Sequence, residues 1–154
     1  MLVFLDIDGV LVPAKSWQNP PILGDGFPGF SSKAVTVLQN LLSEDVTIVL
    51  TTSHRLRYTI EQWKVIFQYR GLNVCNVKTI GKSNNSQSRK DELLNWFNIH
   101  TVTEDFIIID DDKSLNDLPP FLKERLVLTS PMIGLTEVHL EAINFILNSP
   151  PQIA

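Results

Sequence analysis

The sequence has almost no cysteine and no long hydrophobic segment. Cys75 is its single cysteine, which excludes an internal disulfide framework and favours a reducing cytoplasm. No apolar run approaches the ~20 residues that a membrane-spanning helix needs, so we expect no membrane partner. The apolar stretch MLVFL lacks a basic flank and reaches Asp6 too early for a signal peptide. These absences predict a cytoplasmic protein.

Positive charge is scarce overall, but it is concentrated in the middle of the chain. The net charge of −4 argues against a broadly basic nucleic-acid binder. Between His54 and Lys90, however, eight Lys or Arg residues stand against one acid, Glu61, so this segment carries +7 and the remainder −11. Most asymmetry of this kind is solvated surface, but it would also attract a phosphorylated substrate.

Short apolar runs alternate with amphipathic segments along the 154 residues, a length that favours a single domain over residues 1–154. Several of the runs are β-branched, and three are almost wholly apolar, which is typical of parallel strands buried on both faces. We expect strands at 2–5, 46–50, 73–77, 106–109 and 125–128. We expect helices after a cap at Ser31 or Ser32 as far as residue 42, at 56–70 with Gly71 as the stop, at 89–97, and from Thr136 to before Pro150.

This alternation predicts an α/β fold with a doubly wound, Rossmann-like sheet. The sheet would be mostly parallel and five-stranded, with helices on both faces and no large cap domain. Residues 10–30, rich in Pro and Gly, are too few for a domain and too many for a routine connection, so we interpret them as a flap beside the active site. In such sheets ligands bind outside the carboxyl ends of the strands.

Carboxylates follow two of the predicted strands. Asp6 and Asp8 follow the first, and residues two apart on a strand point to the same side, so the two acids need a compensating cation or a chemical use. The other carboxylates, after the fourth strand, are Asp110, Asp111 and Asp112. Oxygen ligands without a suitable Cys/His set favour Mg²⁺ over zinc. His54 has no metal-ligand spacing, and only its place after the second strand would let it line the site.

Four features of the sequence resemble the motifs of the haloacid dehalogenase (HAD) superfamily. They are DIDGVL after an apolar strand, a Thr ending the second strand, a basic residue opening a later helix, and a strand that ends in Asp-Asp. LTTSHR, RKDELLNW, IIIDDDKSLNDLP and GLT resemble more narrowly the HAD domains associated with Swiss-Army-knife RNA repair proteins. The resemblance covers about residues 2–136 and implies a HAD-type, capless fold.

The resemblance also implies chemical roles. Asp6 would be the nucleophile that forms an aspartyl-phosphate, and Asp8 would protonate the leaving oxygen and later deprotonate water. Mg²⁺ would be held by Asp6, the main-chain carbonyl of Asp8 and an acid of the last motif, where Asp110 and Asp111 match best and Asp112 less well.

The hydroxyl group and the cation of the site each have two candidate residues in the sequence. Thr51 is favoured over Thr52 as the residue that hydrogen-bonds the phosphoryl oxygens, because it is the first hydroxyl after the apolar run. The spacing R-x-x-E-L favours Arg89 as the cation, but Lys90 is adjacent and lysine is commoner in the superfamily. The remaining predicted substrate contacts are Gly9, Thr52, Ser53 and Arg55.

The most favoured function is a Mg²⁺-dependent phosphatase that hydrolyses phosphomonoesters through an aspartyl-phosphate. Capless members of the superfamily leave the site open to bulky substrates, which together with the RNA-repair resemblance and the basic segment suggests a polynucleotide end such as a 3′-phosphate. One alternative is a phosphatase of a small metabolite or nucleotide, over which the flap would close. Another is a non-catalytic binding module with the HAD fold. The sequence leaves the natural substrate and the oligomeric state undetermined.

Overall fold

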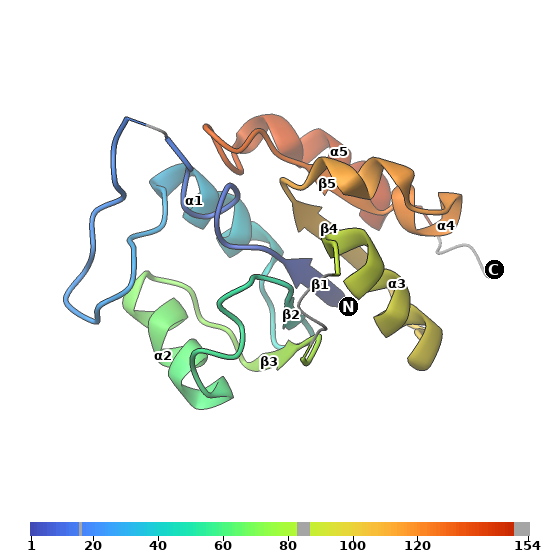
Figure 1. The fold of residues 1–154 in the computed structure, drawn as a ribbon, viewed down its shortest axis with the longest axis horizontal. Coiled ribbons are helices and arrows are strands. Elements are labelled where there is room, and N and C mark those ends of the chain that lie inside the picture. Colours follow the sequence, from blue (N-terminus) through green and yellow to red (C-terminus); the bar gives the residue numbers. More distant parts are fainter. Residues whose placement is uncertain (16, 83–86, 150–154) are drawn as a thin grey trace.

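The computed structural model describes residues 1–15, 17–82 and 87–149, and their strands form one parallel sheet between two layers of helices (Figure 1). All four strand pairings are parallel. The order across the sheet is β3-β2-β1-β4-β5. This confirms the predicted doubly wound, five-stranded α/β fold. The strands are β1 (Leu2–Leu5), β2 (Thr47–Leu50), β3 (Asn76–Thr79), β4 (Phe106–Asp110) and β5 (Leu126–Leu128).

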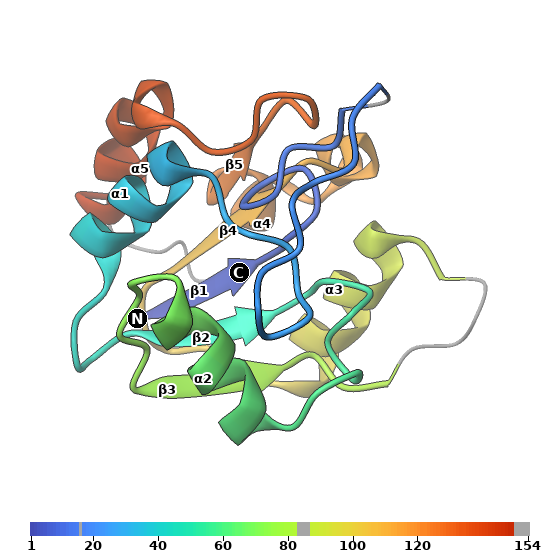
Figure 2. The same cartoon turned by 90° about the vertical axis from the view of Figure 1, so that its left-hand side faces the viewer.

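Alternate residues of the strands belong to two separate hydrophobic cores, one on each face of the sheet. Val3 and Leu5 of β1 pack on one side with helices α1 (Ser32–Leu41), α2 (Ile60–Tyr69) and α5 (Leu140–Leu147). Leu2 and Phe4 pack on the other side with α3 (Arg89–Ile99), η1 (Lys113–Asp117) and α4 (Pro120–Lys123). Figure 2 shows the sheet between α1 and α5 on one side and α3 on the other. Both faces of the sheet are therefore covered, as parallel strands require.

Side-chain caps set where the helices begin. The Ser31 hydroxyl accepts a hydrogen bond from the Ala34 amide (3.1 Å), which selects Ser31 over Ser32 as the cap of α1. Thr59 forms a capping box with Gln62, so α2 begins at residue 60, four residues later than expected, and turns occupy the residues before it. Gly71, at φ +83°, ends α2 as predicted.

The prediction for the third strand was wrong by three residues. The edge strand β3 occupies 76–79 instead of 73–77, and Val77 alone of its four residues is buried. The apolar residues that suggested the earlier start are Val74, which packs against the core without pairing in the sheet, and Cys75, which is exposed. Thr136 caps the short helix η2 (Glu137–His139), which leads into α5. The turns η1 and α4 carried no apolar pattern strong enough to predict them.

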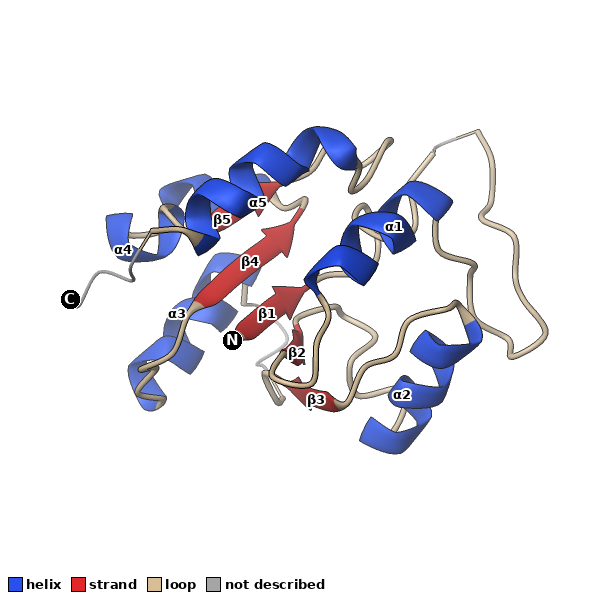
Figure 3. Ribbon diagram, turned by 180° about the vertical axis from the view of Figure 1, so that it is seen from behind, coloured by secondary structure: helices blue, strands red, loops and turns tan. Residues whose placement is uncertain are grey.

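The order of the strands places the ends of β1 and β4 next to each other. The chain runs from β1 to β2 and β3 on one side and returns to β4 and β5 on the other, so the two halves separate between β1 and β4. Figure 3 shows β1 and β4 side by side with their arrowheads pointing the same way. The Asp6 amide donates to the Ile109 carbonyl (3.1 Å), and the Thr51 amide donates to the Leu5 carbonyl (3.0 Å). A switch point of this kind is where doubly wound sheets bind ligands.

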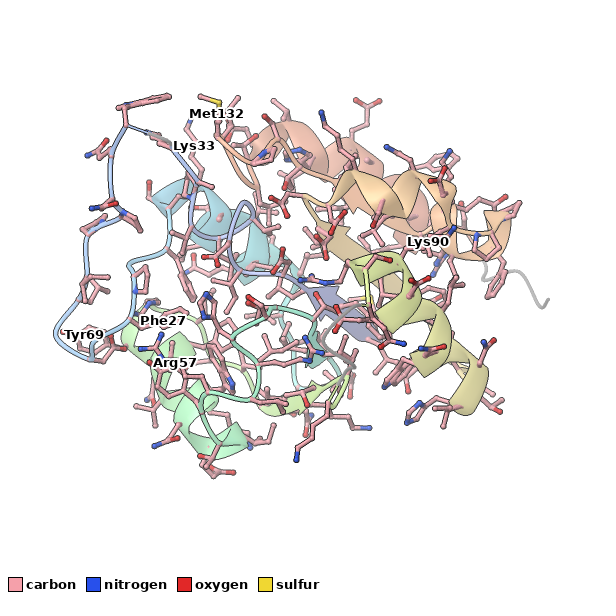
Figure 4. All side chains as sticks on the ribbon, viewed as in Figure 1. Phe27, Lys33, Arg57, Tyr69, Lys90 and Met132 are labelled. Atoms are coloured by element: carbon pink, nitrogen blue, oxygen red, sulfur yellow. The ribbon has the colours of Figure 1, made fainter. Side chains whose placement is uncertain are left out.

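The flap at 10–30, whose residue 16 lies outside the described residues, is tied to the end of α2. The Arg70 guanidinium donates to both carboxylate oxygens of Asp25 (2.6 and 2.9 Å) and to the carbonyls of Phe27 (2.9 Å) and Pro28 (3.0 Å). Phe27 is buried against the ring of Trp63, and Figure 4 shows it where the flap meets α2. These contacts make this part of the flap a fixed wall.

The remaining predictions concern membrane segments, the single cysteine, the location of the protein and the number of domains. Among the described residues, no helix is long and apolar enough to cross a membrane. Cys75 is exposed and unpaired. The cytoplasmic location and the single-domain interpretation of residues 1–154 both stay predictions.

Candidate active site

Three carboxylates meet at the switch point between β1 and β4. Asp6 follows β1, Asp110 ends β4, and Asp111 comes next; one carboxylate oxygen from each lies within 4.8 Å of the other two. Backbone amides hold the two buried carboxylates: Ile7 donates to Asp6 Oδ1 (2.8 Å), while Asp111 donates to Asp110 Oδ1 (2.8 Å). The ends of two neighbouring strands therefore build a compact acidic cluster.

Arg89 is the cation that reaches this cluster. As the first residue of α3, it places Nη1 2.7 Å from Asp110 Oδ2 and 3.6 Å from Asp6 Oδ1, and it donates to the Thr51 hydroxyl (3.1 Å). Lys90 lies on the same first turn of α3 (Figure 4), but it forms no ion pair with the described residues. The geometry therefore brings Arg89, and not Lys90, together with the three acids.

Burial perturbs the ionisation of these groups. Desolvation and the neighbouring charge of Asp110 raise the pKa of Asp6 to about 8, against a usual value of 3.8. Burial likewise raises the pKa of Asp110, although Arg89 opposes that shift. Burial by itself would lower the pKa of Arg89, but Asp110, Asp6 and Glu92 raise it, so the guanidinium stays charged.

The donor set fits a hard divalent cation. A bound cation requires its carboxylate ligands to be deprotonated, and the guanidinium of Arg89 would then offset only one of the three charges of the described cluster. Carboxylate oxygens are the ligands that Mg²⁺ prefers. The main-chain carbonyl of Asp8 accepts no hydrogen bond from any described residue, so it also has a lone pair available. Asp112 is committed elsewhere, because its carboxylate accepts from the Ser114 amide (2.9 Å) and caps η1.

Gly9 lets the loop after β1 approach Asp111 closely. Its φ is +80°, and a Cβ on this residue would lie 2.0 Å from Asp111 Oδ2. The Thr129 hydroxyl donates to the Gly9 carbonyl (2.7 Å), and the Leu135 amide donates to the carbonyl of Val10 (2.8 Å). The segment that contains GLT thus supports the loop from behind, and Gly9 makes room for an acid of the site.

Of the two threonines after β2, one contacts the site and the other stabilises its own loop. Thr51 is buried with its hydroxyl on Arg89, whereas the Thr52 hydroxyl accepts from the His54 amide (3.2 Å) within the loop. Thr51 is therefore the hydroxyl that faces the acidic cluster. Ser53 is exposed on the same loop.

The position of Arg55 does not support the predicted substrate contact. Its side chain is 6% exposed and donates to the carbonyls of Gly81 (2.8 Å), Thr51 (3.3 Å) and Thr52 (3.1 Å). Its last contact is an ion pair with Glu92. Because these contacts occupy the guanidinium, Arg55 instead holds together the loop after β2 and the loop after β3.

Glu92 was missed by the sequence analysis. Its carboxylate pairs with Arg55 and also lies 3.5 Å from Arg89 Nε. The signal was present in the spacing R-x-x-E, which puts Arg89 and Glu92 on neighbouring positions of one helix face. Glu92 thereby links Arg55, in the loop after β2, to Arg89, the cation of the site.

The Asp8 side chain is not one of the three clustered acids, because β1 ends at Leu5 and the strand geometry expected to align Asp8 with Asp6 does not extend that far. Its side chain is 54% exposed, and its Oδ2 is 2.8 Å from His54 Nε2. From the sequence, only the place of His54 after β2 connected it with the site, since no ligand spacing involves it. The contact joins residues that are 46 positions apart in the chain.

Comparison with known proteins agrees with the motifs. The family model described as the HAD domain in Swiss Army Knife RNA repair proteins matches residues 2–140. No curated protein and no solved structure matches the chain significantly. The family match includes β1, β2, β4 and α3, the elements that carry Asp6, Thr51, Arg89 and Asp110. The chain therefore belongs to the family of HAD domains found in Swiss Army Knife RNA repair proteins.

Proposed function

We propose that the protein is a Mg²⁺-dependent phosphatase that hydrolyses phosphomonoesters through an aspartyl-phosphate on Asp6. The observation that carries the proposal is the meeting of Asp6, Asp110 and Asp111 around Arg89 and beside Thr51. A carboxylate nucleophile divides phosphate transfer into two easier steps. Membership of the HAD family supports the same reaction class.

Four groups of the chain would hold the cation. They are the carboxylates of Asp6, Asp110 and Asp111 and the main-chain carbonyl of Asp8, all of them oxygen donors. When bound, Mg²⁺ would offset the charge of these carboxylates and of the phosphoryl oxygens.

The residues themselves perform two displacements. In the first, an oxygen of Asp6 bonds to phosphorus, the bond from phosphorus to the leaving oxygen breaks, and Asp8 gives that oxygen a proton. In the second, Asp8 takes a proton from the water that attacks the aspartyl-phosphate, and inorganic phosphate leaves. Thr51 and Arg89 would donate hydrogen bonds to the phosphoryl oxygens. The exposure of Asp8 suits a group that must reach both the leaving oxygen and water.

A polynucleotide end, such as a 3′-phosphate, is the substrate we propose. The RNA-repair family supports it. So does the anchoring of the flap by Arg70, which argues against closure over a small molecule. The basic segment supports this substrate less than its charge suggested, because Arg55 and Arg70 are buried in ion pairs.

The test is phosphate release with Mg²⁺ from a panel of esters. The panel contains a 3′-phosphorylated RNA oligomer, a 5′-phosphorylated one, nucleotides and sugar phosphates. Preferred release from an oligomer end, falling steeply as salt is added, is the expected result. Preference for a small ester would replace the polynucleotide with a metabolite, and binding of Mg²⁺ without any release would favour a non-catalytic module.

A further inference from the structure

The contact between His54 and Asp8 is a part of the site that the two displacements leave unexplained. An exposed carboxylate at the end of a strand has several staggered rotamers available. Among the described residues, His54 is the hydrogen-bonding partner of the Asp8 side chain, and it engages Oδ2 alone. The bond therefore selects one orientation of the carboxyl group and leaves Oδ1 unbonded there.

His54 is itself held in place. Its amide donates to the Thr52 hydroxyl (3.2 Å), and the next residue, Arg55, is fixed by the four contacts described above. The imidazole meets the ring of Phe27 edge-to-face, with the centroids 5.8 Å apart and the planes at 89°. A side chain that orients another must itself be held by packing, and the ring of Phe27 supplies that contact for the imidazole.

The support for His54 extends into the flap. Phe27 is buried, its carbonyl accepts from Arg70 (2.9 Å), and its ring also packs on Tyr58 and Trp63. The fixed part of the flap therefore forms the wall on which the imidazole rests. The flap therefore supports His54, a role that does not require it to cover the substrate.

From these contacts we propose that His54 is a positioning residue that holds the Asp8 carboxyl group in the orientation for proton transfer to the leaving oxygen. The inference rests on the proposed phosphatase function. A general acid must lie within hydrogen-bond reach of the atom it protonates, so fixing one carboxyl oxygen directs the other. His54 acts through Asp8 and forms no bond to the substrate.

A positioning role for His54 has a kinetic consequence that a purely structural role lacks. When an alkyl phosphate is cleaved, the leaving oxygen of the sugar or alcohol is a strongly basic alkoxide, which leaves phosphorus slowly unless it is protonated. The p-nitrophenolate anion is stable enough to leave without a proton. Loss of a well-placed acid therefore slows the first class of ester selectively. Damage to folding would reduce the amount of active enzyme and lower both rates equally.

The experiment measures kcat and KM of the full chain with Mg²⁺ on the 3′-phosphorylated RNA oligomer, whose leaving group is a sugar alkoxide, and on p-nitrophenyl phosphate. His54→Leu keeps apolar contact with Phe27 but removes the nitrogen, and His54→Gln restores an N–H donor of similar reach. His100→Leu is the matched control, because His100 also packs on an aromatic ring, that of Trp96 (4.1 Å between centroids), at the far end of α3.

We expect His54→Leu to lower the ratio of the two kcat values, alkyl over aryl, by about tenfold, a part of the ~10²–10⁴-fold that general acid catalysis supplies. KM should change little, His54→Gln should recover most of the ratio, and His100→Leu should match the wild type. An unchanged ratio in His54→Leu overturns the role of His54 and leaves the phosphatase standing. A wild type that releases phosphate from neither ester nor any oligomer end overturns the proposed function, and this inference with it.

Discussion

Replacing Gly9 with alanine should displace a carboxylate of the site. The new Cβ would lie 2.0 Å from Oδ2 and 2.5 Å from Cγ of Asp111, whereas ordinary contact begins at 3.4 Å. The Asp111 carboxylate must therefore move by more than an ångström from its place in the acidic cluster. The variant also carries a backbone cost of about 1–2 kcal/mol, because φ is +80° and alanine disfavours this region.

Gly26 provides a matched control for the backbone cost. Its φ is +82°, and a Cβ there would meet no atom within 4 Å. Gly9→Ala and Gly26→Ala should therefore lose similar free energies of unfolding, about 1–2 kcal/mol each. Only Gly9→Ala should also weaken the binding of Mg²⁺, by about 10- to 100-fold, the range typical of a disturbed metal site.

Calorimetric titration with Mg²⁺ and urea unfolding separate the two effects. The titration is best done above pH 8, where Asp6, whose pKa burial raises to about 8, is ionised in the metal-free protein. If Gly9→Ala binds Mg²⁺ as tightly as Gly26→Ala does, Asp111 does not contribute to the site in the way that the geometry indicates.

Three further predictions concern the flap, the loop after β1 and the buried acid. Arg70→Met should lower the free energy of unfolding by about 3 kcal/mol, since it leaves a carboxylate and buried carbonyls unpaired, whereas the exposed Arg57→Met should change it by less than about 0.5 kcal/mol; equal effects in urea unfolding would refute the anchoring role. Thr129→Val should cost about 1–2 kcal/mol by removing the donor to the Gly9 carbonyl, and Thr129→Ser, which keeps the hydroxyl, should recover most of it. Because the Asp6 pKa is raised from 3.8 to about 8 on folding, the metal-free protein binds the extra proton between these values, so its stability should fall as pH rises through this window; a melting curve for Asp6→Asn with the same fall would contradict this.

The sequence was sufficient to place the motifs at the ends of the strands. Buried parallel strands are almost wholly apolar, so β1, β2 and β4 were visible as short runs, and the polar residues that follow them could be assigned to one edge of the sheet. The edge strand β3 was misplaced because Lys78 is exposed and Thr79 is polar, so the apolar pattern stops at Val77 although the strand continues. Short polar turns such as η1 carry no periodicity at all.

Adjacent residues of like chemistry could not be separated by pattern. Whether Thr51 or Thr52 faces the site depends on the side to which the last strand residue points, and whether Arg89 or Lys90 does so depends on the first turn of α3. The Ser88 hydroxyl accepts from the Asp91 amide (3.1 Å) and sets that turn, which brings Arg89 to Asp110.

Contacts between distant loops were also beyond the sequence. Arg55 follows a strand in a basic segment, which suggests an exposed cation, but Glu92 and three carbonyls draw it into the protein. His54 meets Asp8 across 46 positions of the chain, and the ring of Phe27 that packs on the imidazole comes from the flap. Neither pairing has a local signature.

The role of Asp6 as the nucleophile is tested most directly by comparing wild type with Asp6→Asn. Phosphate release from the 3′-phosphorylated RNA oligomer and from p-nitrophenyl phosphate is measured with Mg²⁺, and melting curves confirm that both proteins fold. We expect release by the wild type and only background release by Asp6→Asn, with no loss of melting temperature, because the substitution removes a buried carboxylate whose pKa is already raised. Release by Asp6→Asn at the wild-type rate would contradict the aspartyl-phosphate mechanism.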